Sequence, residues 1–489
     1  MKKGKVSRMK RTRITSALLA VLLAAGCISA CGKKEEEKKE SNTQAPVNDE
    51  YTVDGVKLEL PEIDGGGEDF DVFIAYGVAN QDFVTPEEET GDTINDIRFQ
   101  RNHEVMDKFN VEFKVKEGLS NNGEGTPIIR SLIQSGDDTY EVFINVQHVG
   151  IPLIYEDLFV EWGENMPHAN LDNPWWYSNV IRDLNYNDKV YVTAGAYNFH
   201  CLKGMGVLSF NKTMMDELEL EYPYEMVKNG TWTVDKLIEY NKKALKDLNG
   251  DGLFKTEDDR FGLAGWQYEM TPALFVGMGG EPVTKDDDKL PTLNLNNERT
   301  FNVLDKLIEV FDDGNGAFRN AAPEPYAKTG NMFKEGRLMF HDTNLDQLPG
   351  LREMEDDFGA IPFPKLDEDQ ETYYSRIVNY SSLTYIPVTN DKLELTSAIL
   401  EHMAFLSYRD LIPAFYDVIL TIKTNRDYET EEMIDIVRNG ARFMDENFFG
   451  TGSLNSIIDA GQNTLASNYT SQEDAWLVKL EGYIEFWEK

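Results

Sequence analysis

The chain has 489 residues, with 86 Asp and Glu against 48 Lys and Arg, and its formal net charge is −38. Such a charge repels nucleic acid and anionic lipid, and it makes carboxylate pairs too frequent for their spacing to identify an acid–base site. A chain of this length and hydrophobic content is too large for one core, so we expect two lobes.

The chain begins with the basic stretch MKKGKVSRMKRTR, followed by the apolar run ITSALLAVLLAAGCISA. This run is short for a membrane-spanning helix and typical of a secretion signal. It ends in ISAC, which resembles the bacterial lipobox, where cleavage precedes a cysteine that receives diacylglycerol. We therefore expect residues 1–30 to be a lipoprotein signal peptide and Cys31 to carry the lipid. Cys27 is the alternative, but it has Ala three positions upstream.

Residues 31–50 are charged and polar, so they read as a disordered tether that holds the body off the membrane. The expected location is the extracellular face of the cell membrane. Outside the leader and Cys31, the only cysteine is Cys201, so disulfides are not expected to stabilise the fold. A lone cysteine of this kind is more often a buried small hydrophobic residue than a nucleophile.

The first part of the body alternates strands and helices. FDVFIAYG reads as a strand, and INDIRFQRNHEVMDKFN follows as a helix with apolar residues on one face. VEFKVKE, IIRSLIQSG and YEVFINV continue the pattern as strand, helix and strand. Alternation of this kind predicts an α/β lobe in which parallel strands are joined by helical crossovers.

The second part continues the alternation. KVYVTAGAYN and GVLSFNK read as extended segments, TWTVDKLIEYNKKALKDL as a helix, FGLAGW as a strand and TPALFVGMGG as a helix. RTFNVLDKLIEVFDDG is an amphipathic helix, and MFKEGRLMFHD is a helix end that runs into a strand. FGAIPFPK and YSSLTYIPV are further extended segments, and the C-terminal third is mostly helical.

One loop has the spacing of a calcium-binding EF-hand loop. DLNGDGLFKTEDDRFG places oxygen ligands at the first, third, fifth and twelfth positions, a glycine at the sixth and a backbone carbonyl at the seventh. The expected ligands are Asp247, Asn249, Asp251, Leu253 through its carbonyl, and Asp258. Lys255 at the ninth position fits poorly. A structural Ca²⁺ is our prediction; the alternative is an Asn-Gly-Asp-Gly turn without metal.

Several stretches together resemble the extracellular solute-binding proteins of family 1, the maltodextrin-binding-like proteins of ABC importers. Besides the lipobox, the stretches that carry the resemblance are TGDTINDIRFQRNHEVMDKFNVEF, NPWWYSNVIRDLNYNDKVYVTAGAYN, LSFNKTMMDELELEYPYEMVKNGTWTVDKLIEYNKKALKDLNGDG, FKEGRLMF and DFGAIPFPKLDEDQETYYS. The resemblance spans nearly the whole chain after the leader. Some relatives that bind oligosaccharides also carry an EF-hand-like loop in the second lobe.

The resemblance implies an α/β, two-lobe periplasmic-binding-protein-like fold of type II, with discontinuous lobes joined by hinge crossings near 200, 341 and 389. Lobe 1 would comprise 51–200 and 342–388, and lobe 2 would comprise 201–341 and 389–489. It also implies a monomer that holds a sugar or oligosaccharide in the interlobe cleft, closes around it and presents it to the permease.

Sugars have apolar C–H faces ringed by hydroxyls, so a sugar site combines aromatic rings with planar polar side chains. Trp266 is the preferred stacking candidate because it ends the strand FGLAGW, and ligands bind at the carboxyl ends of strands in open α/β sheets. Tyr268 and Glu269 follow it. Trp175 and Trp176 are further candidates, although adjacent residues face opposite ways and at least one should belong to the core.

Further candidates flank other strands. His341, Asp342 and Asn344 lie just past FKEGRLMF, where a solvated turn is the alternative interpretation. Tyr76 follows the first strand, and Asn198 lies in the stretch implied to be the first crossing. Trp232 begins a helix and reads as a packing residue.

The resemblance implies no catalysis, and no catalytic motif argues for an enzyme. The sequence lacks a G-x-S-x-G elbow and a Walker loop, and His103 begins an H-E-x-x-D stretch that lacks the second histidine of a zinc site. Three alternatives remain: a surface glycan-binding lipoprotein not coupled to transport, an importer component for a peptide or small anion, and a glycan-cleaving enzyme.

Overall fold

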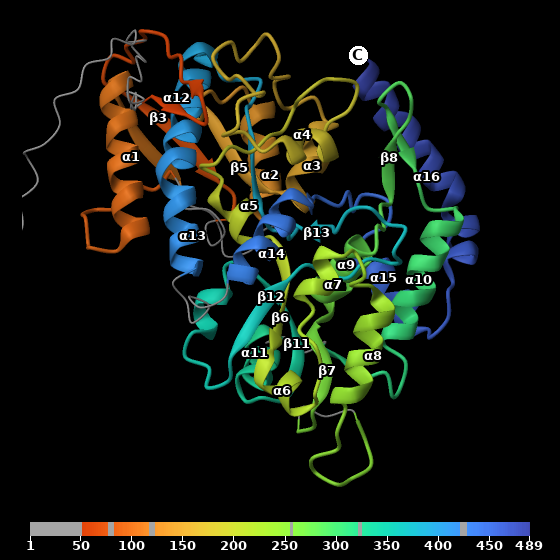
Figure 1. Cartoon of the computed structure of the whole chain (residues 1–489). Coiled ribbons are helices and arrows are strands. Elements are labelled where there is room, and N and C mark those ends of the chain that lie inside the picture. The colour runs from red at the N-terminus through yellow and green to blue at the C-terminus, as the bar shows by residue number, and fades with distance from the viewer. Residues whose placement is uncertain (1–50, 77–82, 117–122, 255–257, 321–324, 421–427) are drawn as a thin grey trace, which may run out of the picture. The chain divides into compact units, whose positions relative to one another are not determined.

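The computed structural model describes residues 51–76, 83–116, 123–254, 258–320, 325–420 and 428–489. Contacts between Cα atoms make residues 53–489 one compact unit (Figure 1). The predicted signal peptide, the lipidated Cys31 and the tether lie outside the described residues. Among the described residues, no helix is long and apolar enough to cross a membrane.

A four-stranded sheet organises the first lobe, in the order β14-β5-β3-β4. Its strands are β3 (Glu68–Ile74), β4 (Val111–Lys116), β5 (Val142–Val146) and β14 (Ser382–Tyr385). The first three are parallel, and β14 is antiparallel to β5. All five residues of β5 are buried, as expected for a parallel strand covered on both faces. The helices of this part are α1 (Thr93–Phe109), α2 (Gly125–Gln134), α3 (Gln147–Ile154), α4 (Ser178–Leu184) and α5 (Phe199–Lys203).

A five-stranded mixed sheet organises the second lobe, in the order β10-β7-β11-β6-β12. Its strands are β6 (Gly206–Asn211), β7 (Phe261–Trp266), β10 (Ala317–Asn320), β11 (Leu338–Asn344) and β12 (Phe358–Ile361). β6 runs antiparallel to its neighbours. The helices are α6 (Lys212–Glu217), α7 (Tyr224–Lys228), α8 (Val234–Ala244), α9 (Gln267–Gly277), α10 (Glu298–Val310) and α11 (Pro325–Lys334).

The remaining elements lie outside these two sheets. They are β1 (Thr52–Val53), β2 (Val56–Lys57), β8 (Val283–Lys285), β9 (Pro291–Leu293), η1 (Leu348–Leu351), β13 (Ser375–Arg376), α12 (Leu393–Leu406), η2 (Ser407–Leu411), α13 (Ile412–Leu420), α14 (Tyr428–Asn439), β15 (Ala441–Arg442), α15 (Thr451–Asp459) and α16 (Leu465–Glu488). α12 packs against α1 of the first lobe, whereas α15 packs against α9 and α10 of the second (Figure 1).

The expected lobe boundaries after residue 341 are therefore wrong. β12 pairs with β6, so the chain stays in the second sheet beyond 342 and reaches the first sheet only at β14. Residues after 389 do not return at once to the second lobe, because α12 covers α1. The sequence shows that β12 and α12 exist, but their partners are set by contacts with residues far away in the chain.

The hydrophobic core confirms the packing expected for two residues. In the second lobe, Trp232 is fully buried and its indole N–H donates to the carbonyl of Pro362 at 3.1 Å. Its ring packs against Phe340 of β11 at 5.5 Å. Cys201 is a buried free thiol, as predicted for a small hydrophobic residue.

Candidate functional site

The two sheets approach each other where the chain crosses between the lobes. The bridge between Met205 and Ile377 joins two crossing segments, and the N–H of Leu345 donates to the carbonyl of Met205 at 3.1 Å. β7 and β11 are parallel, so both reach this region at their carboxyl ends, and β5 ends beside Ser381. The carboxyl ends of strands in open α/β sheets are the usual place for a ligand.

Buried polar atoms without a hydrogen-bond partner gather around these crossings. Buried polar atoms are normally paired with protein or water, so each exception points to a missing partner. Among the described residues, the unpartnered atoms near the crossings are Asn145 Nδ2, Gln147 Oε1, Asp342 Oδ2, Asn344 Oδ1, Gln347 Oε1, Ser375 Oγ and Ser381 Oγ. Both donors and acceptors are present, so a bound molecule with hydroxyl groups would satisfy them.

A buried ion triad lies in the same region. Arg376, which is 2% exposed, donates through Nη1 to Glu269 Oε2 at 2.6 Å and through Nη2 to Glu446 Oε1 at 2.9 Å. Burial alone would lower the pKa of the guanidinium, but the two carboxylates outweigh it and raise that pKa. Burial also raises the pKa of the Glu269 carboxyl, which Arg376 opposes. The guanidinium thus joins α9 of the second lobe to the segment after β15.

Asp342 is the least compensated carboxyl group of this region. It is 3% exposed, and Oδ2 has no partner. Burial, and then the charge of Glu269, raise its pKa well above the ordinary value. Gly265 makes room for it, because a Cβ there would lie 2.5 Å from the Cβ of Asp342. The folded environment therefore favours the protonated form of Asp342 more than water does. A protonated carboxyl group donates one hydrogen bond and accepts others.

Trp266 and Tyr268 supply aromatic surface beside these groups. Trp266 ends β7 and is half-buried, and Tyr268, in the first turn of α9, is 45% exposed. Their ring centroids are 5.4 Å apart with an interplanar angle of 59°. The strand end and the first turn of the helix thus place an aromatic pair, Glu269 and Asp342 in one neighbourhood, as the sequence suggested.

The structure assigns Trp175 and Trp176 to the first-lobe core. They are 0% and 3% exposed, so neither ring has a free face. Both indole N–H groups donate to the Glu401 carboxylate of α12, at 2.9 and 2.7 Å. At least one of them was expected in the core, and in fact both lie there. The reason is that a buried carboxylate far away in the sequence binds the pair.

Three further candidates have other surroundings. His341 is buried against α11, stacked on Phe333 at 5.6 Å and hydrogen-bonded to Thr329, on the opposite face of β11 from Asp342. Burial lowers the pKa of His341 to about 3. Asn198 is buried and accepts hydrogen bonds from the Gly195 N–H and the Thr384 hydroxyl. Tyr76 is half-buried just after β3.

The sequence did not single out Arg376, Glu446 or Gln147. Gln147 Nε2 donates to the carbonyl of Met444 at 2.7 Å, which links α3 to the segment after β15. Together with Glu446 it lines a small pocket of about 180 Å³. The one signal in the sequence was the position of Arg376 directly before the apolar residues Ile377 and Val378. This position does not indicate which carboxylates pair with Arg376.

The predicted metal loop brings three carboxylates together. Ligand oxygens of Asp247, Asp251 and Asp259 lie within 4.8 Å of one another. The Asp247 carboxylate accepts hydrogen bonds from the N–H groups of Gly250 and Gly252, at 2.5 and 2.9 Å, which fixes the turn. Leu253 directs its N–H to Asp251.

The last ligand differs from the prediction. Asp258 at the twelfth position is exposed and outside the group, whereas Asp259 is fully buried. A pair of backbone hydrogen bonds between Lys246 and Arg260 closes the loop next to Asp259. One carboxylate oxygen of Asp259 accepts from the Leu248 N–H, and Oδ2 is buried without a partner. Three converging carboxylates with an unpaired buried oxygen suit an oxygen-seeking cation such as Ca²⁺.

Sequence comparison found no matching family model and no similar curated protein. Solved structures with this fold were found. An ABC substrate-binding protein from Listeria monocytogenes, Lmo0181 in complex with cycloalternan, is 11% identical, with a TM-score of 0.52 over 83% of this chain and 97% of that one. UgpB from Mycobacterium tuberculosis, in complex with glycerophosphocholine, is 14% identical, with a TM-score of 0.52 over 84% and 98%.

A third similar structure is an ABC transporter solute-binding protein from Thermotoga lettingae bound with α-D-tagatose. It is 13% identical, with a TM-score of 0.51 over 86% of this chain and 100% of that one. At these identities the likeness shows the fold alone. The expected two-lobe α/β architecture is thereby confirmed: this chain has the fold of the ABC substrate-binding proteins.

Proposed function

We propose that the protein is a lipid-anchored extracellular substrate-binding protein of an ABC importer, which captures a carbohydrate between its lobes and delivers it to the permease. The observation that carries this proposal is the pair of buried, unpartnered oxygens of Asp342 and Asn344 at the carboxyl end of β11, next to the end of β7, where Trp266 and Tyr268 form an aromatic pair. Hydroxyl groups donate and accept, and sugar C–H faces stack on aromatic rings, so a saccharide matches both features.

The charge balance argues for a neutral ligand. Arg376 is a buried cation at the strand ends, and Glu269 and Glu446 already neutralise it. Phosphate or carboxylate recognition normally uses an arginine whose fork is open to the ligand. UgpB binds a phosphodiester on a similar fold, so the fold does not select the ligand, whereas the paired Arg376 disfavours an anion here.

Thermal unfolding tests the proposal. The chain without residues 1–31 is heated with mono- and oligosaccharides, peptides and organic anions, since a ligand that binds only the folded state raises the transition. A saccharide-specific rise that is lost in Trp266→Ala, with the sugar recovered intact, supports the proposal. A rise with peptides alone, or a cleaved sugar, would replace it with peptide transport or an enzyme.

Lipid anchoring rests on the ISAC stretch. Metabolic labelling with a fatty acid should mark the full chain and the Cys27→Ser variant but not the Cys31→Ser variant. If labelling is lost in Cys27→Ser instead, Cys27 is the lipidated residue. If the full chain is not labelled at all, the proposed lipid anchor is wrong. Co-purification of the lipidated protein with permease subunits separates an importer component from a surface glycan-binding lipoprotein.

We also propose that Asp247, Asp251 and Asp259 hold a structural Ca²⁺. The buried, unpaired oxygen of Asp259 supports the site, because an uncompensated buried carboxylate is costly and a cation would neutralise it. Asn249 and the Leu253 carbonyl remain candidates for further ligands on the loop. The ion would stabilise the loop between α8 and β7 and take no part in ligand chemistry.

Calorimetry with Ca²⁺ and Mg²⁺ tests the site. Ca²⁺ should raise the unfolding temperature of the wild type, and Asp259→Ala and Asp247→Ala should abolish that rise. Asp258→Ala is the matched control, since its carboxylate lies outside the group, and it should keep the response. A rise that survives in Asp259→Ala would overturn the ligand set, and no rise in the wild type would exclude the metal.

A further inference from the structure

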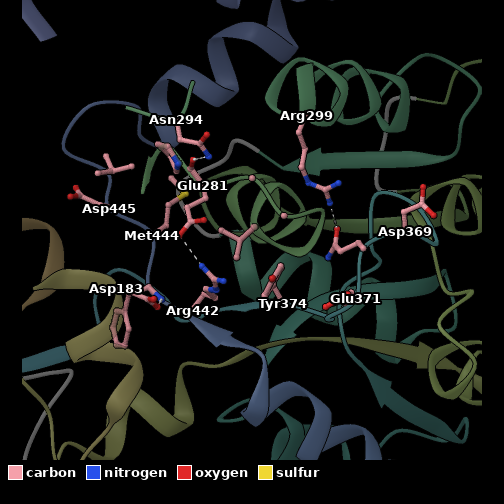
Figure 2. Close-up of a pocket in the computed structure, with 17 residues that line it drawn as sticks. Asp183, Glu281, Asn294, Arg299, Asp369, Glu371, Tyr374, Arg442, Met444 and Asp445 are labelled. Carbon is pink, nitrogen blue, oxygen red and sulfur yellow. Dashed lines mark hydrogen bonds and ion pairs between the residues drawn. The ribbon is translucent and has the colours of Figure 1, made fainter. Parts of the chain in front are cut away.

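A second pocket lies beyond the far end of α9. It encloses about 390 Å³ between the end of α9, the segment 279–283, the stretch before β13 and the segment after β15 (Figure 2). Its polar side chains include Glu281, Asn294, Arg299, Tyr374, Arg442 and Asp445. Ligand pockets in proteins span roughly 300–1,000 Å³, so the volume suits a small sugar unit.

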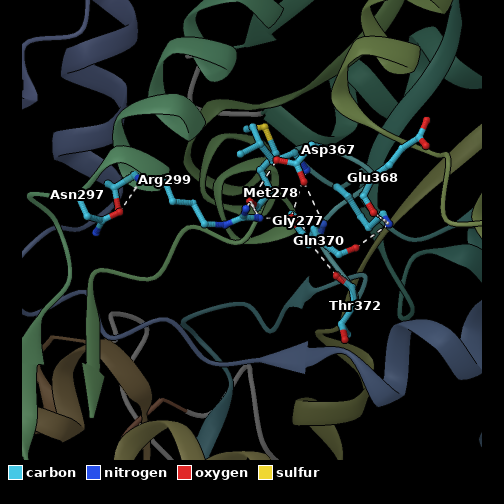
Figure 3. Close-up of polar contacts among 11 residues, drawn as sticks. Gly277, Met278, Asn297, Arg299, Asp367, Glu368, Gln370 and Thr372 are labelled. Carbon is cyan, nitrogen blue, oxygen red and sulfur yellow. Dashed lines mark hydrogen bonds and ion pairs between the residues drawn. The ribbon is translucent and has the colours of Figure 1, made fainter. Parts of the chain in front are cut away.

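One wall of this pocket is fixed by a hydrogen-bonded hub at Gln370 (Figure 3). Its amide N–H₂ donates to the carbonyls of Gly277 and Thr372, both at 2.8 Å, and its carbonyl oxygen accepts from Arg299 at 2.8 Å and from the Leu366 N–H at 3.2 Å. Every polar atom of the Gln370 side chain is therefore used. The hub positions Arg299 at the pocket, and a preformed wall lowers the entropic cost of binding.

The opposite wall presents Arg442 and Tyr374. Arg442 Nη1 pairs with Glu281 Oε1 at 2.8 Å, and its guanidinium lies over the Tyr374 ring at 4.5 Å (Figure 2). Among the described residues, Nη1 is the one nitrogen of Arg442 with a hydrogen bond, and the Tyr374 hydroxyl has none. Planar donors with their charge already balanced are suited to vicinal hydroxyl groups.

The pocket offers acceptors as well as donors. Asp445 lines it, but the Asp445 carboxylate already accepts hydrogen bonds from Asn447 and Tyr186, so the available acceptors are the exposed carboxylates of Asp369 and Glu371 at the rim. An anion would meet these carboxylates, and an apolar molecule would leave the polar groups without partners. A neutral polyhydroxylated molecule can donate to the carboxylates and accept from the two guanidinium groups.

The position of the pocket relates it to the strand-end site. α9 begins directly after Trp266 and has 11 residues, so about 16 Å separates its two ends. Asp445 lines this pocket and also the small pocket that Gln147 and Glu446 line, next to Arg376. The segment after β15 therefore borders both regions.

We propose that the pocket between Arg299 and Arg442 is a saccharide subsite, continuous with the strand-end site, and that the ligand is consequently an oligosaccharide several rings long. This inference rests on the proposed carbohydrate function and names the class of sugar. A monosaccharide or disaccharide would occupy one end of α9, and a longer chain would reach both ends.

Isothermal titration calorimetry with matched pairs of sugars tests the subsite. The probes are the disaccharide and the tetrasaccharide of the maltose, β-mannan, cellulose and xylan series. For the series that binds, the tetrasaccharide should bind the wild type at least about tenfold more tightly, and Arg442→Lys and Tyr374→Phe should reduce that advantage about tenfold and threefold. Disaccharide affinity should change less than twofold in both variants.

Arg438→Lys is the matched control, because Arg438, on the exposed face of α14, also pairs with a carboxylate, Asp435, and lies over a tyrosine ring, Tyr416. It should leave both affinities unchanged. Equal binding of the two chain lengths, or loss of disaccharide affinity in Tyr374→Phe, would overturn the subsite and leave the carbohydrate function in place. No binding of any sugar by the wild type would overturn both.

Discussion

The two tryptophan-bearing regions differ in how their buried carboxyl groups are paired. Around Trp175 and Trp176, Glu401 accepts four hydrogen bonds, from both indoles, from the Asn173 amide and from the Asn170 N–H, at 2.7 to 3.1 Å. Around Trp266, Asp342 Oδ2 and Asn344 Oδ1 are buried without partners. A fully paired carboxylate such as Glu401 holds a fold together, whereas a buried carboxyl group with an unpaired oxygen, such as Asp342, can still bind a further donor.

The most conspicuous aromatic motif of the sequence is therefore structural, and a less conspicuous tryptophan lies at the site. The density of tryptophans in NPWWYSN says nothing about which groups their N–H atoms meet. The balance of donors and acceptors, available only in three dimensions, separates the two roles. Four substitutions test this separation, and they are taken from the largest expected effect to the smallest.

Glu401→Ala should lower the free energy of unfolding by about 3–5 kcal/mol, because it leaves three side-chain donors and one backbone N–H buried without an acceptor. Urea unfolding followed by tryptophan fluorescence measures this loss. Glu394→Ala, on the exposed face of the same helix, should change stability by less than about 0.5 kcal/mol. A small loss in Glu401→Ala would mean that the Trp175–Trp176 cluster is not held by this carboxylate.

Trp266→Ala should weaken saccharide binding about tenfold or more and cost less than about 1 kcal/mol of stability, since the ring is half-buried and stacking contributes mostly to the complex. Trp476→Ala is the matched control, because Trp476 is also half-buried beside a tyrosine, Tyr469 at 5.7 Å, on α16. The Trp476→Ala variant should bind the sugar with the same affinity as the wild type. Equal affinities in both variants would remove Trp266 from the site.

Asp342→Asn should increase stability at neutral pH and have no such effect near pH 4. The folded-state pKa of Asp342 is raised, so the folded protein binds the proton more tightly than the unfolded chain, and wild-type stability falls as the pH rises above about 4. Asparagine does not titrate, so the difference between the proteins should grow by up to about 1.4 kcal/mol per pH unit until the folded pKa is reached.

Urea unfolding of both proteins from pH 4 to 8 measures this difference. Thr343→Val, on the same strand β11, serves as the control, because neither side chain titrates and its stability difference from the wild type should therefore not change with pH. A flat profile for Asp342→Asn would show that the carboxyl group is compensated by contacts other than those described above.

Tyr268→Ala should have the smallest effect. Its ring is 45% exposed, so stability should change by no more than about 0.5 kcal/mol. Affinity should fall about two- to threefold, near the lower end of the roughly 0.5–1.5 kcal/mol that an aromatic pair contributes, because Tyr268 packs on the Trp266 ring and acts through it. A loss as large as that of Trp266→Ala would identify Tyr268 as a direct ligand contact.

Local structure was predictable where periodicity is strong. The strands β3, β4, β5, β6 and β7 and the helices α1, α8 and α10 lie where the apolar pattern places them. The stretch 189–198 was expected to be extended, and the structure gives it isolated bridges, such as Thr193 with Thr384, in place of a continuous strand. Gly195 and Ala196 have little or no side chain to pack against a neighbouring strand. The Gly195 N–H donates to the Asn198 side chain, which forms a turn in place of a strand–strand hydrogen bond.

The site was only partly predictable, for a different reason. Trp266, Tyr268, Glu269, Asp342 and Asn344 could be found because they follow strand ends, which is a local property. Arg376 could not be paired with Glu269 and Glu446, since those contacts depend on how distant segments pack. The same limit applies to His341. The sequence showed that neighbouring residues of this strand alternate between two faces, but it did not show that helix α11 would cover the face of His341.

The pairing of β14 with β5 has a consequence for the order in which the protein can fold. Val146 faces Ser382 across this ladder, and α12, which covers α1, follows it in the chain. An emerging chain therefore cannot complete its first lobe until most of the second has been synthesised. Such long-range pairing slows folding. For a chain exported as proposed, this delay would keep the N-terminal half loose enough to pass through a translocation channel.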